Sequence, residues 1–201
     1  MMRLVRCLSM IGMVVWLAGC SSAPIHFYTL VPPDHAAPVS AATAAYRIAV
    51  LPVTIPAQVD QPQMVVREGA SSVALLEGER WIAPLGDEIH MALSDALVRD
   101  LGAQDIYGLA GGGNKPVYRI KVNVDRFESV PGSHTLLAAS WSVRRHDGKG
   151  QAMQCTSRIR ETVGPGYAAL AGGHQRALQT LAGYIATAVR GMAEGGAGAC
   201  R

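Results

Sequence analysis

The sequence predicts a single α+β domain, built from one mixed sheet with an antiparallel meander and from two helices packed on one face of it. Three observations lead to this fold class. Short runs of alternating apolar and polar residues, typical of strands, recur along the chain. Two longer segments carry apolar residues at helical spacing. The resulting order of strand, hairpin, helix, three-stranded meander and helix is typical of α+β proteins. We expect the other face of the sheet to be partly exposed and available to partners.

Residues 1–19 have the features of an export signal. Arg3 and Arg6 make the start positive, and residues 7–17 form an apolar run of the length usual for a signal peptide. A membrane-spanning helix would need about 20 apolar residues. The run ends in Leu-Ala-Gly directly before Cys20, which resembles the lipobox of bacterial lipoproteins. We therefore expect residues 1–19 to be removed and Cys20 to carry acyl chains such as palmitate. The alternative is an ordinary secretory signal with a coincidental cysteine.

The residues after Cys20 indicate the membrane. Two or more acyl chains anchor a protein stably. In the bacterial sorting rule that this segment resembles, an aspartate beside the cysteine favours the inner membrane, whereas Ser21 and Ser22 follow here. We expect outer-membrane localisation, with the domain facing the periplasm.

Composition excludes some functions and leaves one question open. The mature chain keeps 182 of the 201 residues, enough for one domain with a real core. Loss of two arginines reduces the 18 Lys and Arg to 16, against 15 Asp and Glu, so the chain has no basic footprint for nucleic acid. Cys155 and Cys200 remain in a compartment that permits disulfides. They pair, or Cys155 points inward as a small hydrophobe.

The first half of the chain predicts a short strand over 25–30 and a connector rich in Pro, Ala and Ser over 31–45. A β-branched and apolar run over 46–53 follows and suits a buried strand. Two short strands over 63–67 and 71–77 form a hairpin.

A helix is predicted from Pro84 to Gly102. Proline is tolerated at the first helical position, acidic residues follow it, and glycine fits the end. Apolar residues, among them Leu85, Ile89 and Leu93, form one stripe along it.

The second half predicts a meander and a closing helix. After a glycine-rich loop over 108–116, three strands alternate, beginning near Tyr118, Leu137 and Met153 and separated by glycine turns. The helix runs over 167–192, and His174 falls on its apolar stripe as a buried core histidine. We divide the mature chain into a lipidated N-terminus with strand and connector (20–45), the α+β domain (46–193) and a loose glycine-rich tail (194–201).

A search for catalytic chemistry finds no convergent set. The six histidines are scattered, without the spacing of a metal site, and no Gly-x-Ser-x-Gly elbow is present. The Gly111-Gly112-Gly113-Asn114-Lys115 segment leads through Pro116 into a strand, whereas a phosphate-binding loop opens a helix. We expect no enzymatic activity, no metal, and no cofactor beyond the covalent lipid on Cys20.

An ordered set of phrases resembles a known family. Residues 60–67 read D-Q-P-Q-M-V-V-R, residues 79–85 read E-R-W-I-A-P-L, and similar phrases open at Phe27 and Tyr167. This resembles the PqiC-like, or ABC-type transport auxiliary, lipoproteins across essentially the whole mature chain. The loop over 111–116 and the tail with Cys200 have no counterpart in the pattern.

The resemblance implies a function by contact. These lipoproteins are outer-membrane partners of periplasmic MCE-domain proteins, which form tunnels or rings for (phospho)lipid movement between the membranes. An inner-membrane permease with its ATPase, or a PqiA-type protein, completes the system. The chain would dock the far end of the MCE assembly to the outer membrane as a homo-oligomeric ring, in a system that maintains membrane integrity.

The same phrases supply the candidate partner-binding residues Trp81, Arg80, Arg67 and Asp60. Tryptophan is frequent in interface hot spots, and turn residues such as Asp60 are not needed to fill a core. The alternatives are that Trp81 packs beneath the first helix and that the two arginines are merely solvated. Trp141 is expected in the core.

Two other function classes stay open at this stage. An accessory lipoprotein of another envelope assembly or secretion machine would share the lipobox, the size and the lack of chemistry. A periplasmic hydrolase would need a convergent acid–base pair in a pocket.

Overall fold

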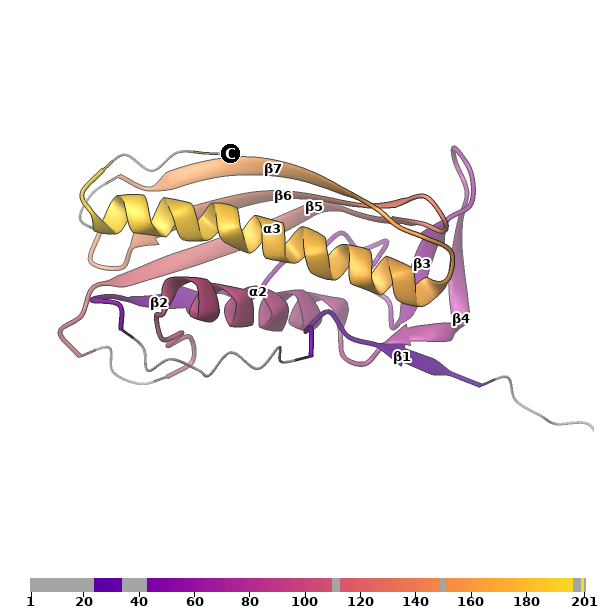
Figure 1. Cartoon of the computed structure of the whole chain (residues 1–201), viewed down its shortest axis with the longest axis horizontal. Coiled ribbons are helices and arrows are strands. Elements are labelled where there is room, and N and C mark those ends of the chain that lie inside the picture. Colours follow the sequence, from indigo (N-terminus) through magenta and orange to yellow (C-terminus); the bar gives the residue numbers. More distant parts are fainter. Residues whose placement is uncertain (1–23, 34–42, 110–112, 149–150, 197–199, 201) are drawn as a thin grey trace, which may run out of the picture.

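The computed structural model describes residues 24–33, 43–109, 113–148, 151–196 and 200. It forms one α+β domain with two helices, which confirms the predicted class (Figure 1). The elements in chain order are β1 His26–Tyr28, β2 Arg47–Val50, β3 Gln63–Arg67, β4 Val73–Trp81, α2 Leu85–Leu101, β5 Val117–Val130, β6 His134–Arg145, β7 Met153–Thr162 and α3 Tyr167–Ala193.

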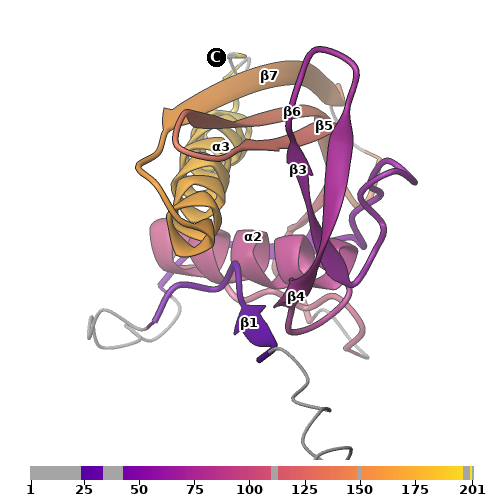
Figure 2. The same cartoon turned by 90° about the vertical axis from the view of Figure 1, so that its right-hand side faces the viewer.

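The larger sheet has four strands in the order β2-β5-β6-β7. β2 is parallel to β5, and the other neighbours are antiparallel, so the predicted meander is present. Ile120, Val122 and Val124 point into the core, whereas Lys121 and Asp125 are exposed, because side chains alternate along a strand. Both helices lie on the same side of this sheet (Figures 1 and 2).

The expectation of a single sheet is wrong, because β1, β4 and β3 form a separate three-stranded sheet. β2 occupies the edge of the larger sheet beside β5, where Arg47 pairs with Val117. The hairpin of β3 and β4 therefore stands across one end of the molecule (Figure 2). Its inner residues Met64 and Val66 close the core there. Alternation predicts that a strand has one buried face, but it does not name the partner strand.

Two strands are longer than predicted, because each contains or faces an irregularity. β5 continues to Val130 through a register shift between Val124 and Arg126, which turns Phe127 and Ser129 inward. β4 continues to Trp81 past a shift opposite Gln63 and Met64. A bulge reverses the alternation and so conceals the continuation of a strand in the sequence pattern.

The helices supply one wall of the core. Leu85, Ile89, Leu93 and Leu97 of α2 are buried along the predicted stripe. Gly102 ends α2 in the left-handed conformation with φ of 56°, which glycine adopts without steric cost.

One acidic residue of α2 has a role that the pattern did not indicate. The buried carboxylate of Glu88 accepts hydrogen bonds from the Leu30 backbone N–H (2.7 Å) and the Thr29 hydroxyl (2.8 Å). These bonds fasten the segment after β1 to the start of α2.

Candidate partner-binding site

Trp81, the last residue of β4, is a core residue with 4% of its surface exposed. Its ring meets Phe127 edge to face, with centroids 6.0 Å apart, and its backbone N–H donates to the Pro62 carbonyl (3.0 Å). A side chain this buried offers no contact area to another protein. The assignment of Trp81 as a partner-binding residue is therefore corrected, and the alternative of a core tryptophan describes the structure.

Arg67, at the end of β3, is partly buried, with 31% of its side chain exposed, and neighbouring groups hold its guanidinium. Its Nε donates to Oε2 of Glu128 (2.6 Å), and Nη1 donates to the Gly69 and Ala70 carbonyls (3.3 and 3.2 Å). The guanidinium thus closes the β3–β4 turn and fastens it to β5. Arg67 is neither free in solvent, as one alternative held, nor available as a primary partner contact.

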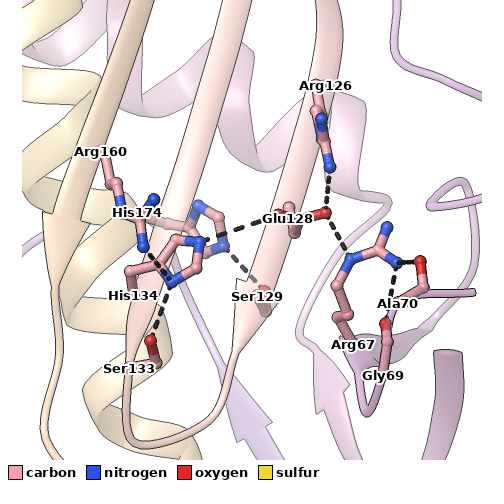
Figure 3. A network of polar contacts seen from close by, with 10 residues as sticks. All are labelled: Arg67, Gly69, Ala70, Arg126, Glu128, Ser129, Ser133, His134, Arg160 and His174. Carbon is pink, nitrogen blue, oxygen red and sulfur yellow. Dashed lines mark hydrogen bonds and ion pairs between the residues drawn. The ribbon is translucent and has the colours of Figure 1, made fainter. Parts of the chain in front are cut away.

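The acid that receives Arg67 is the centre of a polar network (Figure 3). Glu128 also accepts from Nη2 of Arg126 (2.6 Å) and lies 3.8 Å from Nε2 of His134. Burial alone would raise the pKa of Glu128, but the hydrogen bonds and charges of Arg126 and Arg67 outweigh it and hold that pKa below its ordinary value. The carboxylate is therefore ionised and held by cations, which suits a structural clasp.

His134 extends this network toward β7. Its Nδ1 lies 3.0 Å from the Ser133 hydroxyl and 3.1 Å from Nη2 of Arg160. Burial and the charge of Arg160 lower the pKa of His134, against the opposing effect of Glu128. The alternation of residues along each strand did not predict the cluster around Glu128 and His134, because its members come from separate strands and from the turns between them.

Arg80 has 33% of its side chain exposed, about as much as Arg67. Nε of Arg80 donates to the Glu77 carbonyl (3.1 Å), and its Nη2 lies 3.7 Å from the Glu77 carboxylate. Asp60 is exposed on the loop before β3. These two residues stay candidates for partner contact, and the structure places them in different surroundings.

Asp60 lies on an open depression of about 360 Å³, lined on one side by residues 60–62 and on the other by residues 81–85. The bond from Trp81 N–H to the Pro62 carbonyl brings these two segments together. Ile82 stands at this site with 59% of its surface exposed. We define the docking loop as residues 60–62 together with 82–84. Ile82 was missed because an apolar residue between a tryptophan and a proline also suits a core.

His174 is a core residue, as expected. It is fully buried, stacks on Phe127 with ring centroids 3.7 Å apart, and its Nε2 lies 2.9 Å from the Ser129 hydroxyl (Figure 3). Burial lowers the pKa of His174 to about 3. The neutral ring has no route to solvent as an acid or base.

The two remaining cysteines are joined, with Cys155 of β7 bonded to Cys200 of the tail. Cys20 and the rest of the export signal lie outside the described residues, as do parts of the connector and of the glycine-rich loop. Within the described ranges, no group of three His, Cys, Asp or Glu side chains could hold a metal ion. No helix in the same ranges is long and apolar enough to cross a bilayer.

Comparison with known proteins places this geometry in a family. The model of the ABC-type transport auxiliary lipoprotein component matches residues 28–186. This chain belongs to that family. The match runs from the last residue of β1 into α3 and includes both segments of the docking loop, so the resemblance found in the sequence is confirmed. Family membership makes the chain an auxiliary lipoprotein component of a transport system.

Solved structures share the fold of this auxiliary lipoprotein. The crystal structure of an uncharacterized protein has a TM-score of 0.64 at 14% identity, covering 82% of this chain and 97% of the other. A Xanthomonas campestris protein of the DUF330 family has a TM-score of 0.58 at 16% identity, covering 85% and 98%. A PelC dodecamer from Paraburkholderia phytofirmans reaches only 0.39 at 10% identity, covering 70% and 87%, which supports no statement about assembly. No curated protein matches the chain.

Proposed function

We propose that this chain is a non-catalytic lipoprotein that docks a periplasmic MCE-domain assembly to the outer membrane. Acyl chains on Cys20 anchor it, and the domain faces the periplasm. The assembly moves (phospho)lipid between the membranes and contributes to membrane integrity, and an inner-membrane permease or PqiA-type protein acts at its other end. The lipoprotein needs no cofactor and no metal for this role. It works as a homo-oligomeric ring.

The observation that carries the proposal is the docking loop. It combines an exposed apolar residue, Ile82, with an exposed acid, Asp60, around an open depression. Interfaces bind through a few apolar anchors surrounded by polar groups. The loop also lies within two phrases of the family pattern. The core buries Met64, Val66, Trp81 and Leu85 of these phrases, but it does not explain the exposed Asp60 and Ile82.

The polar groups elsewhere support binding rather than catalysis. Glu128 is committed to Arg67 and Arg126, and His174 is buried with a pKa far below neutrality. A general acid or base must reach its substrate and titrate near the working pH. Neither group meets both conditions.

A pair of matched variants tests the docking loop. Ile82→Asp and Leu109→Asp alter residues of equal exposure, 59% each, at different places on the surface. The tagged lipoprotein is purified from membranes, and co-purified MCE-domain protein is quantified. We expect Ile82→Asp to lose most of it and Leu109→Asp to retain it, with both variants melting near the wild type.

Three results would contradict the proposal. Equal recovery of the MCE-domain protein with both variants would exclude the docking loop. Recovery of an outer-membrane assembly or secretion component in its place would assign the chain to another envelope machine. A monomer in the sizing of the purified lipoprotein would exclude the ring.

A further inference from the structure

The smaller sheet has an apolar outer face. Pairing register places side chains on common faces: Phe27 of β1 opposite Arg80, Val65 opposite Leu75, and Arg67 opposite Val73. Gln63 also pairs with Arg80, and it shares the alternation of Val65 and Arg67. The register shift in this hairpin therefore keeps Arg80 on the side of Leu75, although their numbers differ by an odd step.

Three of the eight large hydrophobic side chains exposed in the described chain lie on this face, and a fourth, Ile25, stands directly before β1. They are Ile25 (47%), Phe27 (57%), Val73 (53%) and Leu75 (47%). We call these four residues the apolar sheet face. Val65, partly buried, lies between its two ends. The charged residues of the same face are Arg67, Arg80 and Glu77, and Glu77 is engaged by Arg80 and by Gln63 Nε2 (3.1 Å).

The outer face of the larger sheet is different. It carries polar side chains, as is usual for the solvent-exposed face of an antiparallel sheet. They are Lys121, Asn123, Ser140 and Thr156. Exposed apolar side chains therefore gather on the smaller sheet, whereas the larger sheet exposes polar ones. Such a patch marks an interaction site.

The length of chain before β1 indicates what covers the patch. Ile25 lies five positions after Cys20, and a fully extended chain over five such steps spans at most about 18 Å. A 100-residue domain has a radius of gyration of about 13 Å, so its full width exceeds this reach. A folded partner therefore does not fit between the acylated cysteine and the start of the sheet.

We propose that the apolar sheet face rests on the membrane surface. Ile25, Phe27, Val73 and Leu75 enter the boundary between headgroups and acyl chains, to the depth usual for interfacial segments. The guanidinium group of Arg80 remains at the level of the lipid phosphates, since long basic side chains keep their charge in the polar layer, whereas Arg67 stays bonded to Glu128. This inference rests on the acylation of Cys20 in the proposed function.

The resulting orientation agrees with the fold. The three-stranded sheet forms one end of the elongated molecule, and the loop after α2 lies at the opposite end (Figure 1). Ile82 of the docking loop follows directly on β4, and its N–H donates to the Tyr28 carbonyl at the end of β1 (2.9 Å). A docked assembly would meet the lipoprotein at the rim of its membrane contact, where lipid enters or leaves the bilayer.

Fluorescent probes in the acylated full chain test the contact. Phe27→Cys, Leu75→Cys and, as control, Leu109→Cys are each labelled with an environment-sensitive dye and reconstituted in vesicles of phosphatidylethanolamine and phosphatidylglycerol. Nitroxide groups on the acyl chains should quench the dye at positions 27 and 75 several-fold more than at 109. The dyes at positions 27 and 75 should emit at shorter wavelength in the acylated protein in vesicles than in the same labelled variants carrying Cys20→Ala, measured in solution without detergent.

The outcomes separate this inference from the docking proposal. Acylation of each variant is checked by mass, and melting confirms folding. Absence of lipid quenching at 27 and 75 in acylated protein overturns the membrane contact, whatever co-purifies. The dyes could also be shielded from an aqueous quencher by a second copy of the chain. In that case the shielding disappears when the protein is diluted over more vesicles, and this result overturns the membrane contact too. Lipid quenching without recovery of an MCE-domain protein retains the contact and overturns the docking role alone.

Discussion

Single buried polar side chains hold distant segments of this molecule together. Glu88 receives the backbone after β1, Glu128 receives two arginines, and His174 joins α3 to Ser129 of β5. Each is almost enclosed, so the loss of one member leaves its partner without a hydrogen bond in a poorly hydrated place. Residues of this kind control stability, whereas exposed residues of the docking loop control contact.

The first prediction concerns Trp81. Trp81→Ala removes a buried ring in contact with Phe127 and should cost about 3–5 kcal/mol of unfolding free energy. Trp81→Phe keeps an aromatic ring and should cost clearly less. Urea denaturation of the mature protein measures both. Unchanged stability with loss of the MCE-domain protein would restore Trp81 as a partner contact.

The second prediction concerns the pH dependence that His174 imposes. Its folded-state pKa of about 3 lies below its ordinary value of 6.5, so the unfolded chain binds a proton in that interval and the folded chain does not. The contribution of neutral His174 to the unfolding free energy is therefore complete above about pH 7. It is lost as the pH falls from 6.5 toward 3, by up to about 1.4 kcal/mol per pH unit.

His174→Gln should reduce the difference in unfolding free energy between pH 7.5 and pH 5, measured in urea. His134→Asn is the control for the other histidine with a lowered pKa, and it should leave most of the difference in place. If the unfolding free energy of His174→Gln keeps the pH dependence of the wild type, His174 is excluded as the cause of that dependence.

At the scale of elements, α3 packs close to the larger sheet at one glycine. A Cβ atom at Gly173 would lie 2.5 Å from Cγ1 of Val163 and 2.9 Å from Oγ1 of Thr135, whereas a Cβ at Gly183 meets nothing within 4 Å. The absence of a side chain at Gly173 therefore determines how near α3 lies to the start of β6 and to the residue after β7.

The third prediction compares these two glycines of one helix. Gly173→Ala should destabilise the protein by about 1–3 kcal/mol, because the added methyl overpacks the contact. Gly183→Ala should stabilise it by about 0.5–1 kcal/mol, because alanine has the higher helix propensity. Thermal melting of both variants checks the opposite signs. Equal shifts would show that α3 moves freely to accept the methyl.

The fourth prediction concerns the bond between β7 and the tail. A disulfide that closes a span of 45 residues restricts the unfolded chain, so Cys200→Ser should cost about 3–4 kcal/mol. Reduction of the wild type should have the same effect. Titration of the denatured, unreduced mature protein should find no free thiol, and two free thiols would disprove the bond.

At the scale of the whole molecule, the domain has distinct surfaces for distinct contacts. The apolar sheet face and the docking loop belong to the end of the molecule that the three-stranded sheet forms, and the outer face of the larger sheet is polar. A domain tethered by its lipid anchor acts by holding its contact surfaces at a fixed place on the membrane. Its activity depends on where the anchor holds it as much as on any single side chain.

The fifth prediction concerns the anchor. Cys20→Ala should be exported but remain without acyl chains, because the thiol that receives the lipid is missing. Acyl labelling and partition into detergent measure this, with Cys200→Ser as the control that should still be labelled. Label on the Cys20→Ala protein would reject the lipobox and with it the outer-membrane assignment.

The sequence determined what depends on local pattern. Alternation along strands and helical spacing located the meander and both helices, and α2 begins and ends within a residue of the prediction. The phrases around Asp60 and Trp81 indicated the family, and their neighbourhood contains the docking loop. These features are readable because each lies within one short stretch of chain.

Only the tertiary structure decided which segments meet. A period of two residues shows that a strand has a buried face, but not that β1, β3 and β4 form their own sheet. The apolar periodicity did not distinguish the buried Trp81 from the exposed Ile82, and no spacing predicted that Arg67 closes on Glu128, 61 residues away. Burial and ion pairing are properties of packing between distant segments, so the residues that hold this fold and those that face a partner became distinct only once the chain was folded.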